Sequence, residues 1–304
     1  MTLPAALLLI FSAGVHAAWN LLGKRENPSP AFMLAANTLG CICLLPVLFL
    51  VKGGLREVFS LARLVWFQLV ITGIAQALYY TALARAYRAG DLSVVYPLAR
   101  ATPVLFVALL TRWLGLGEPV ERLAVLGMLL VVAGCLVLPI PGFAAFHWRN
   151  YTQPACLWAL AAAVGMAGYS LVDSQAINLL RPAVDASQIT IVTALYALLE
   201  GLSASLCLAL VILPLRSGRR DLARIRANGW RQAALVGVGI YLAYTLVLLA
   251  MGLVTNVSYV VAFRQLSIPL GALLGVTVLK EPPHLPKFIG VGLVFAGLIL
   301  VGLG

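Results

Sequence analysis

The chain has 304 residues, of which 62% are hydrophobic and only 10% charged, and its mean hydropathy is +1.01. The surface of a water-soluble domain carries more charge than this, so the composition excludes a soluble protein and indicates an integral membrane protein. The net charge of +11 does not indicate a nucleic-acid partner here. Basic residues at the ends of apolar runs are typical of helices anchored against anionic lipid.

Ten apolar runs follow one another with short gaps, and each is close to the roughly 20 residues that cross a bilayer as a helix. They cover residues 3–22, 31–51, 64–84, 92–112, 122–141, 155–176, 188–213, 232–252, 258–279 and 286–303. Helices are expected because a transmembrane barrel has shorter, alternating segments. The sequence therefore predicts an all-α integral membrane protein with ten transmembrane helices. We expect the first run to be retained, since it lacks the basic start of a cleaved signal peptide.

The first span holds two polar residues, His16 and Asn20, which are four apart and share a helical face. Tyr169 and Asp173 have the same spacing in the sixth span. An imidazole titrates near neutral pH, so His16 is the first candidate to carry a coupled proton and Asp173 is the second. The alternatives are an interhelical hydrogen bond for His16 and a position near the water boundary for Asp173.

Amphipathic side chains recur in the third and eighth spans. Gln76 and Tyr80 share a face of the third span, and Tyr241 and Tyr244 lie in the eighth. Tyrosines line a polar cavity with ring faces and hydroxyls, although core packing explains any single one equally well. Glu200 stands alone in the seventh span, where a structural or lipid-interface role is expected.

Two arginines lie inside the fourth and ninth spans. Arg100 follows Tyr96 by four residues, and Arg264 follows Tyr259 by five, so each pair lies on about one face of its helix. Burying a guanidinium at mid-membrane costs at least about 2.5–3.5 kcal/mol. An anionic substrate bound through bidentate hydrogen bonds would account for both. The alternatives are internal pairing with a carboxylate of the sixth or seventh span, or snorkelling to the interface.

The segment 214–231, between the seventh and eighth spans, is expected to be a basic loop. Six arginines lie in it: Arg216, Arg219, Arg220, Arg224, Arg226 and Arg231. The positive-inside rule places this loop in the cytoplasm and both termini on the other side. The first five spans alone are balanced in charge and give no orientation.

The chain repeats itself at a shift of 163 residues. Gly117-Glu118-Pro119 matches Lys280-Glu281-Pro282, and the same shift places Gly127 on Gly290 and Val131 on Val294. Each unit has five spans, and an odd number of spans gives two units opposite orientations in the membrane. The sequence predicts two inverted five-helix repeats, residues 1–141 and 155–304, joined by a linker at 142–154.

With these features the chain resembles the drug/metabolite transporter superfamily, EamA type. The Gly-Glu-Pro and Lys-Glu-Pro corners and the sequence His16-Ala-Ala-Trp19-Asn20 carry the resemblance. It implies a secondary transporter, with export favoured, of a small polar metabolite. Its members are expected to have cytoplasmic termini, against the charge pattern of this chain.

We therefore expect a multi-pass protein of the inner membrane that moves an anionic metabolite by alternating access through a central cavity between its halves. The expected partners are the substrate, the lipid bilayer and protons, in a monomer or a homodimer. The predicted lining residues are His16, Asn20, Gln76, Tyr80, Tyr96, Arg100, Tyr169, Tyr241, Tyr244, Tyr259 and Arg264.

No nucleotide-binding loop, nucleophile elbow or ligand-spaced histidine is found in the sequence, so no enzyme, metal or cofactor is expected. The alternatives are a flippase for a lipid-linked intermediate, an intramembrane enzyme and a membrane scaffold without transport.

Overall fold

The computed structural model describes residues 1–24, 29–52, 61–89, 92–140, 142, 153–278, 280 and 284–304, and these ranges contain helices and no strand. Long apolar segments take this form because a helix satisfies its own backbone hydrogen bonds. The first half contains α1 (Leu3–Lys24), α2 (Pro30–Leu44), η1 (Leu45–Phe49), α4 (Arg63–Ala89), α5 (Leu92–Leu114) and α6 (Arg122–Val137). The second contains α7 (Pro154–Leu180), η4 (Arg181–Ala183), η5 (Ala186–Gln188), α8 (Ile189–Ile212), α9 (Arg216–Asn228), α10 (Trp230–Met251), α11 (Val257–Phe263), η6 (Arg264–Leu266), α12 (Ser267–Thr277) and α13 (Leu285–Leu303).

Each of the ten predicted spans contains helix, but ten crossings are not confirmed. By length and composition, eight helical stretches of the described chain are able to cross a membrane. The helix α6 has only 16 residues, and α5, which carries Arg100 and Arg112, is not among the eight. The fold is thus all-helical with at least eight apolar helices, and the ten-helix count stays a prediction.

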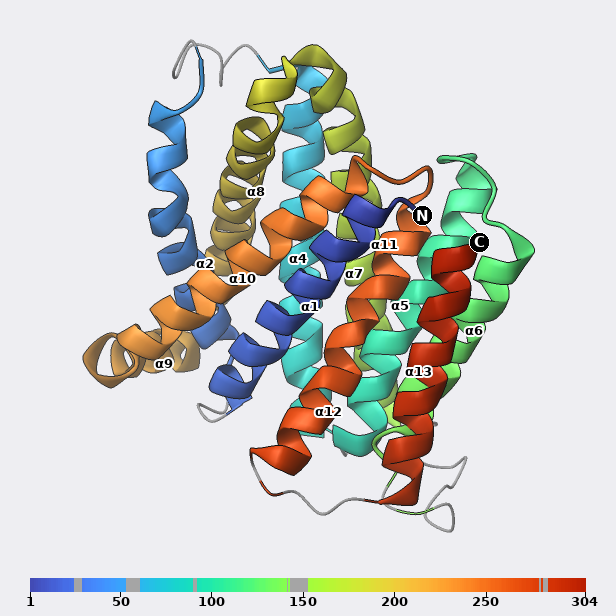
Figure 1. The fold of residues 1–304 in the computed structure, drawn as a ribbon. Helices are drawn as coiled ribbons and strands as arrows, with labels where there is room; N and C mark the ends of the chain where they lie inside the picture. Colours follow the sequence, from blue (N-terminus) through green and yellow to red (C-terminus); the bar gives the residue numbers. More distant parts are fainter. Residues whose placement is uncertain are drawn as a thin grey trace.

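The helices of the two halves pack in reciprocal pairs. The first helix, α1, packs against α10, the third long helix of the second half, and α7 packs in the same way against α4. Likewise α2 packs against α10 and α8 against α4. Both chain termini lie at one end of the bundle, at the upper right of Figure 1. This exchange of partners is what a two-fold relation between two inverted repeats produces.

The contact between α6 and α13 repeats this reciprocity at the level of single residues. A Cβ added to Gly127 would lie 2.5 Å from the carbonyl oxygen of Gly297, and one added to Gly297 would lie 2.5 Å from that of Gly127. A Cβ on Gly134 would lie 2.7 Å from the carbonyl oxygen of Gly290. Glycine therefore lets these helices approach to backbone contact, as small residues do in membrane helix pairs.

The two corners before the last helices share one backbone feature. Gly117 has φ +75°, and Lys280, which matches it at the shift of 163, has φ +56°. Lys280 is the one non-glycine residue in the left-handed region among those described. The first corner also docks on the second half, because Asn256 donates from Nδ2 to the Glu118 carbonyl (2.9 Å) and Glu118 N donates to the Thr255 carbonyl (3.1 Å). Glu281 and Pro282 lie outside the described residues. These features fit the repeat, whose boundaries at 141 and 155 stay a prediction.

The predicted ninth span is not one continuous helix. It is α11, a short 3₁₀ turn η6, and α12. Pro269 has no amide hydrogen, so it cannot bond the carbonyl of Gln265 in the preceding turn. Ser267 instead donates from Oγ to the carbonyl of Arg264 at 2.9 Å. This break in the α-helix is local: Arg264 lies in it, and the backbone around it stays in the right-handed helical region.

The expectation of a loop at 214–231 is wrong, because residues 216–228 form α9. Leu222 and Ile225 on this helix pack against a cluster that includes Leu34 and Leu208, while most of its arginines are exposed. At the lower left of Figure 1, α9 lies between the end of α8 and the start of α10, on the side away from the two termini. Spans were predicted from apolar runs, so this highly charged segment was not recognised as a short amphipathic helix.

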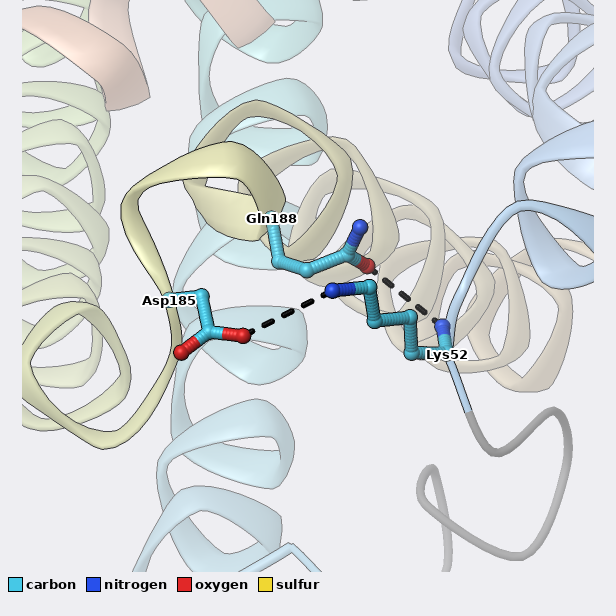
Figure 2. Close-up of polar contacts among 3 residues, drawn as sticks. All are labelled: Lys52, Asp185 and Gln188. Carbon is cyan, nitrogen blue, oxygen red and sulfur yellow. Dashed lines mark hydrogen bonds and ion pairs between the residues drawn. The ribbon is translucent and has the colours of Figure 1, made fainter.

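An exposed contact joins the end of η1 to the turn before α8. Lys52 Nζ lies 3.6 Å from Asp185 Oδ2, and Lys52 N donates to Gln188 Oε1 at 3.4 Å (Figure 2). Both charged side chains are largely exposed to solvent, so the pair adds little stability. It is remote from the polar residues inside the bundle.

Candidate functional site: a buried cluster of arginine, tyrosine and carboxylate

Arg264 is held by two aromatic rings. Its Nη2 donates to the Tyr169 hydroxyl at 3.3 Å. Its Cζ lies 5.2 Å from the ring centre of Tyr244 and 5.7 Å from that of Tyr169. Both distances are within the range of a cation–π interaction. The remaining terminal nitrogen, Nη1, is buried and has no hydrogen-bond partner among the described residues. The guanidinium is thus stabilised on its faces and keeps a donor free.

Asp173 gathers two hydroxyls from neighbouring helices. It lies on α7 and is completely buried. Tyr196 of α8 donates to Oδ1 at 2.8 Å, and Tyr244 of α10 donates to Oδ2. An ionised carboxylate is an acceptor for such donors, and each bond to it is stronger than a neutral one. Tyr244 therefore joins the carboxylate through its hydroxyl to the guanidinium of Arg264 through its ring.

Arg100 meets the same region from the first half. It lies inside α5 and is only 4% exposed. Its Nη2 donates to Ser267 Oγ at 3.2 Å, and that hydroxyl is the group that bonds the Arg264 carbonyl. Ser267 thus connects the two arginines across the break between η6 and α12. Snorkelling to the interface is wrong for Arg100, because its side chain ends in the interior.

Stacked tyrosines continue the cluster into the third helix. The rings of Tyr79 and Tyr169 lie 6.0 Å apart edge to face, and those of Tyr169 and Tyr244 lie 5.9 Å apart in the same way. Tyr80 is beside Tyr79, with 5.0 Å between ring centres. Gln76, one turn earlier on α4, is buried. The rings of α4, α7 and α10 therefore form one aromatic wall next to Arg264.

The polar residues of α1 divide between two positions. The ring of His16 packs edge to face on Trp19, with 4.7 Å between ring centres, and lies within electrostatic range of Arg100 and Arg264. Asn20 is exposed and donates from Nδ2 to the backbone carbonyl of His16 at 3.0 Å. His16 thus belongs to the edge of the cluster, and the Asn20 amide bonds its own helix.

Other predicted lining residues point elsewhere. The Tyr241 hydroxyl donates to Asn37 Oδ1 at 2.8 Å and accepts from Cys41 Sγ at 3.3 Å, inside the contact of α10 with α2. Tyr259 donates to the carbonyl of Gly304 at 3.4 Å. Tyr96 lies in α5, but its side chain is outside the described residues.

Glu200 corrects an expectation, and two residues of the cluster were missed. Glu200 is 1% exposed, so a lipid-interface position is wrong. Tyr196 and Ser267 were not among the lining residues predicted from the sequence. Tyr196 precedes Glu200 by one helical turn, and Ser267 follows Arg264 by three residues. A polar residue one helical turn from a charge in an apolar run is the sequence signal that would have identified Tyr196 and Ser267.

Within the described residues no group of three metal-ligating side chains occurs. The arrangement instead offers an unused guanidinium donor, a second arginine and aromatic faces. Groups of these kinds are able to donate hydrogen bonds to a small polar molecule and to pack against it. The fold and the cluster together define a multi-helix membrane protein with a polar centre.

Comparisons with known proteins agree with this class. The EamA-like transporter family matches residues 3–139 and 153–303, and the chain belongs to this family. The two matched segments coincide closely with the two predicted repeats. A search of curated proteins found no match. Twenty-nine chains of solved structures match, and one of them, a crystal structure of a protein, is 20% identical with a TM-score of 0.64. It covers 98% of this chain and 97% of its own, and at this identity the likeness shows the fold alone.

Proposed function

We propose that this membrane transporter is a secondary transporter of a small polar metabolite with an anionic group, that its direction is export, and that it works in an inner membrane. The observation that carries the proposal is the free Nη1 of Arg264. A buried guanidinium donor without a partner is costly unless a ligand completes it, and carboxylate or phosphate oxygens are its best acceptors. Arg100, tied to the same break through Ser267, supplies a second positive charge for that anion.

Alternating access is the proposed route. The five spans predicted for each half, and the reciprocal packing of α1 with α10 and of α7 with α4, support a motion of one half against the other. Ser267 of the second half accepts a hydrogen bond from Arg100 of the first half and donates to the Arg264 carbonyl, so a substrate bound at these arginines would lie between the two halves. His16 and Asp173 remain the proposed carriers of a coupled proton. Comparing the pH response of transport in His16→Gln and Asp173→Asn variants tests this assignment.

The test of the substrate class is a thermal-shift screen followed by transport in proteoliposomes. Amino acids, sugar phosphates, phosphonates and nucleotides are screened, and an anionic ligand is expected to raise the melting temperature. Arg264→Ala should weaken its binding by about 10- to 100-fold, the equivalent of one or two charge-assisted hydrogen bonds. Arg100→Lys should keep part of the transport, because an ammonium keeps the charge and loses the planar fork.

Arg112→Ala is the matched control, since Arg112 lies on the same helix as Arg100 and is exposed at its end. This variant should transport as the wild type does. Normal transport by Arg264→Ala, or stabilisation by neutral and cationic compounds alone, would contradict an anionic substrate.

A further inference from the structure

A second carboxyl group lies close to the cluster and has no role in the proposed function. Glu200 is in the middle of α8, 1% exposed, and its Oε1 has no hydrogen-bond partner among the described residues. The described chain also provides no ion pair to it. An ionised carboxylate in such a position loses its hydration without gaining donors, which costs far more than burying the neutral acid.

Asp173 has the opposite surroundings although it is a near neighbour. Two tyrosine hydroxyls donate to its carboxylate, one of them from Tyr196, which lies one turn before Glu200 on the same face of α8. Two neighbouring carboxyl groups rarely ionise together, because like charges repel strongly in a medium of low dielectric constant. The two tyrosine hydroxyls stabilise the ionised form of Asp173, so Asp173 is the carboxyl group that carries the charge.

We propose that Glu200 is a proton-binding site that holds its proton at neutral pH while Asp173 is ionised. The consequence of this proton for transport rests on the proposed function. A protonated Glu200 leaves the cluster with a net positive charge, and that charge is the one that an anionic substrate would neutralise. With Glu200 neutral, Arg100 and Arg264 outweigh Asp173 by one positive charge. With Glu200 ionised, the four side chains sum to zero.

Charged and titratable side chains of several helices influence the charge state of the Glu200 carboxyl. Asp173 adds a negative charge and Arg264 a positive one, and the other neighbours are hydroxyls or thiols that are neutral at this pH. The groups in electrostatic range of Glu200 are Asp173, Arg264, Tyr80, Tyr196, Tyr241, Tyr244 and Cys41. Arg264 is the one cation among them, and its donors already serve Tyr169 and, in the proposed function, the substrate.

Proton and anion therefore stabilise one another in the cluster. A bound monoanion neutralises the excess charge only while Glu200 keeps its proton, and an ionised Glu200 competes with the anion for Arg264. By linkage, the factor by which protonation of Glu200 raises the affinity for the anion equals the factor by which the bound anion raises the affinity for the proton. With the monoanion bound and Glu200 protonated, the cluster would carry no net charge.

The experiment is infrared spectroscopy of the full chain in a detergent without ester carbonyls, with no substrate added. A protonated carboxyl side chain gives a carbonyl stretching band that an ionised one lacks. We expect this band in the wild type at pH 7, with the shift that exchange in D₂O causes. Glu200→Gln should abolish the band, Asp173→Asn should keep it, and Glu200→Asp should move it.

Glu118→Gln is the matched control, because Glu118 is exposed at the first corner and its removal should leave the band unchanged. A wild type without the band would overturn the proposal, and so would a band that survives Glu200→Gln. If Glu200→Gln does not fold, the displaced band of Glu200→Asp decides the same question. None of these outcomes depends on transport, so failure here leaves the anionic-substrate proposal standing, and failure of that proposal leaves the proton site intact.

Discussion

At the scale of single residues, the ring of Tyr244 lies between the guanidinium of Arg264 and the carboxylate of Asp173. Tyr244 bonds Asp173 through its hydroxyl and contacts Arg264 through its ring face. A direct ion pair would occupy the donors of the guanidinium, whereas the ring stabilises the cation and leaves the edge of the guanidinium available. This arrangement keeps a cation inside the bundle with one donor, Nη1, unpaired among the described residues, as the proposed anion binding requires.

Substitutions at Tyr244 distinguish the two contributions. Tyr244→Phe removes the hydrogen bond to Asp173 and keeps the ring, and we expect a loss of about 1–3 kcal/mol in unfolding free energy because a buried charged acceptor loses a donor. Tyr244→Leu should lose about 0.5–2 kcal/mol more, since the cation–π contact also disappears. Thermal unfolding of the purified variants measures both.

Tyr241→Phe is the control for this pair. It also removes a buried hydroxyl, the one bonded to Asn37, at a contact away from Arg264. We expect a comparable loss of stability with normal substrate affinity, whereas Tyr244→Leu should lower affinity. Equal affinity in all three variants would show that Arg264 does not need the Tyr244 ring to bind.

The sequence predicted which residues are polar inside the membrane and could not predict which of them meet. Tyr241 and Tyr244 are three positions apart, so about 60° separates them around the helix, and one faces α2 while the other faces α7. Arg100 and Arg264 were found because charge in an apolar run is conspicuous. Tyr196 and Ser267 were not, because a tyrosine or serine there is ordinary until its partner is known.

At the scale of helices, the α6–α13 contact depends on glycine. Gly127→Ala would place a methyl 2.5 Å from a backbone oxygen of α13 that cannot move alone. We expect the helices to separate and the melting temperature to fall. Gly292→Ala is the control on α13, where an added Cβ meets nothing within 4 Å. Equal melting temperatures for the two variants would contradict backbone contact between these helices.

The helix α9 gives a test of orientation. Its arginines and the positive-inside rule place it in the cytoplasm, and Figure 1 places the termini at the other end of the bundle. In a variant without the native cysteines, Ser217→Cys on α9 should react with an impermeant maleimide only after the membrane is opened, and Thr2→Cys should react in intact cells. The reverse pattern would place both termini in the cytoplasm, as the family resemblance implies.

Sequence spacing and apolar run length predicted some of the structural elements and missed others. The shift of 163 pairs Gly117 with Lys280, and both residues have a left-handed backbone conformation. The length of the apolar run did not reveal the break at η6, because a run that includes a 3₁₀ turn is as hydrophobic as one that is α-helical throughout. It also missed α9, whose apolar side is only a few residues wide.

At the scale of the whole molecule, the halves are joined at the end of the bundle where α11 begins. Asn256 donates to the Glu118 carbonyl from the first half and accepts from Ser258 N at 2.9 Å as the cap of α11. Behind this contact Ser258 is fully buried and pairs with Thr111 Oγ1 at 3.2 Å. If the halves move as alternating access requires, this contact has to break on one side of the cycle.

Asn256→Ala should therefore shift the population towards a state open at this end. Losing the amide bonds costs the closed state on the order of 1–3 kcal/mol, which changes a two-state ratio by about 5- to 150-fold. The measurement is maleimide labelling of Ser258→Cys from that end of the bundle, in a variant without the native cysteines. Labelling should be slow alone and faster when Asn256→Ala is added. Asn37→Ala removes another buried amide away from this contact and should not change it. Equal labelling rates with and without Asn256→Ala would mean that the contact is not a gate and that access to the cluster from this side needs a different movement.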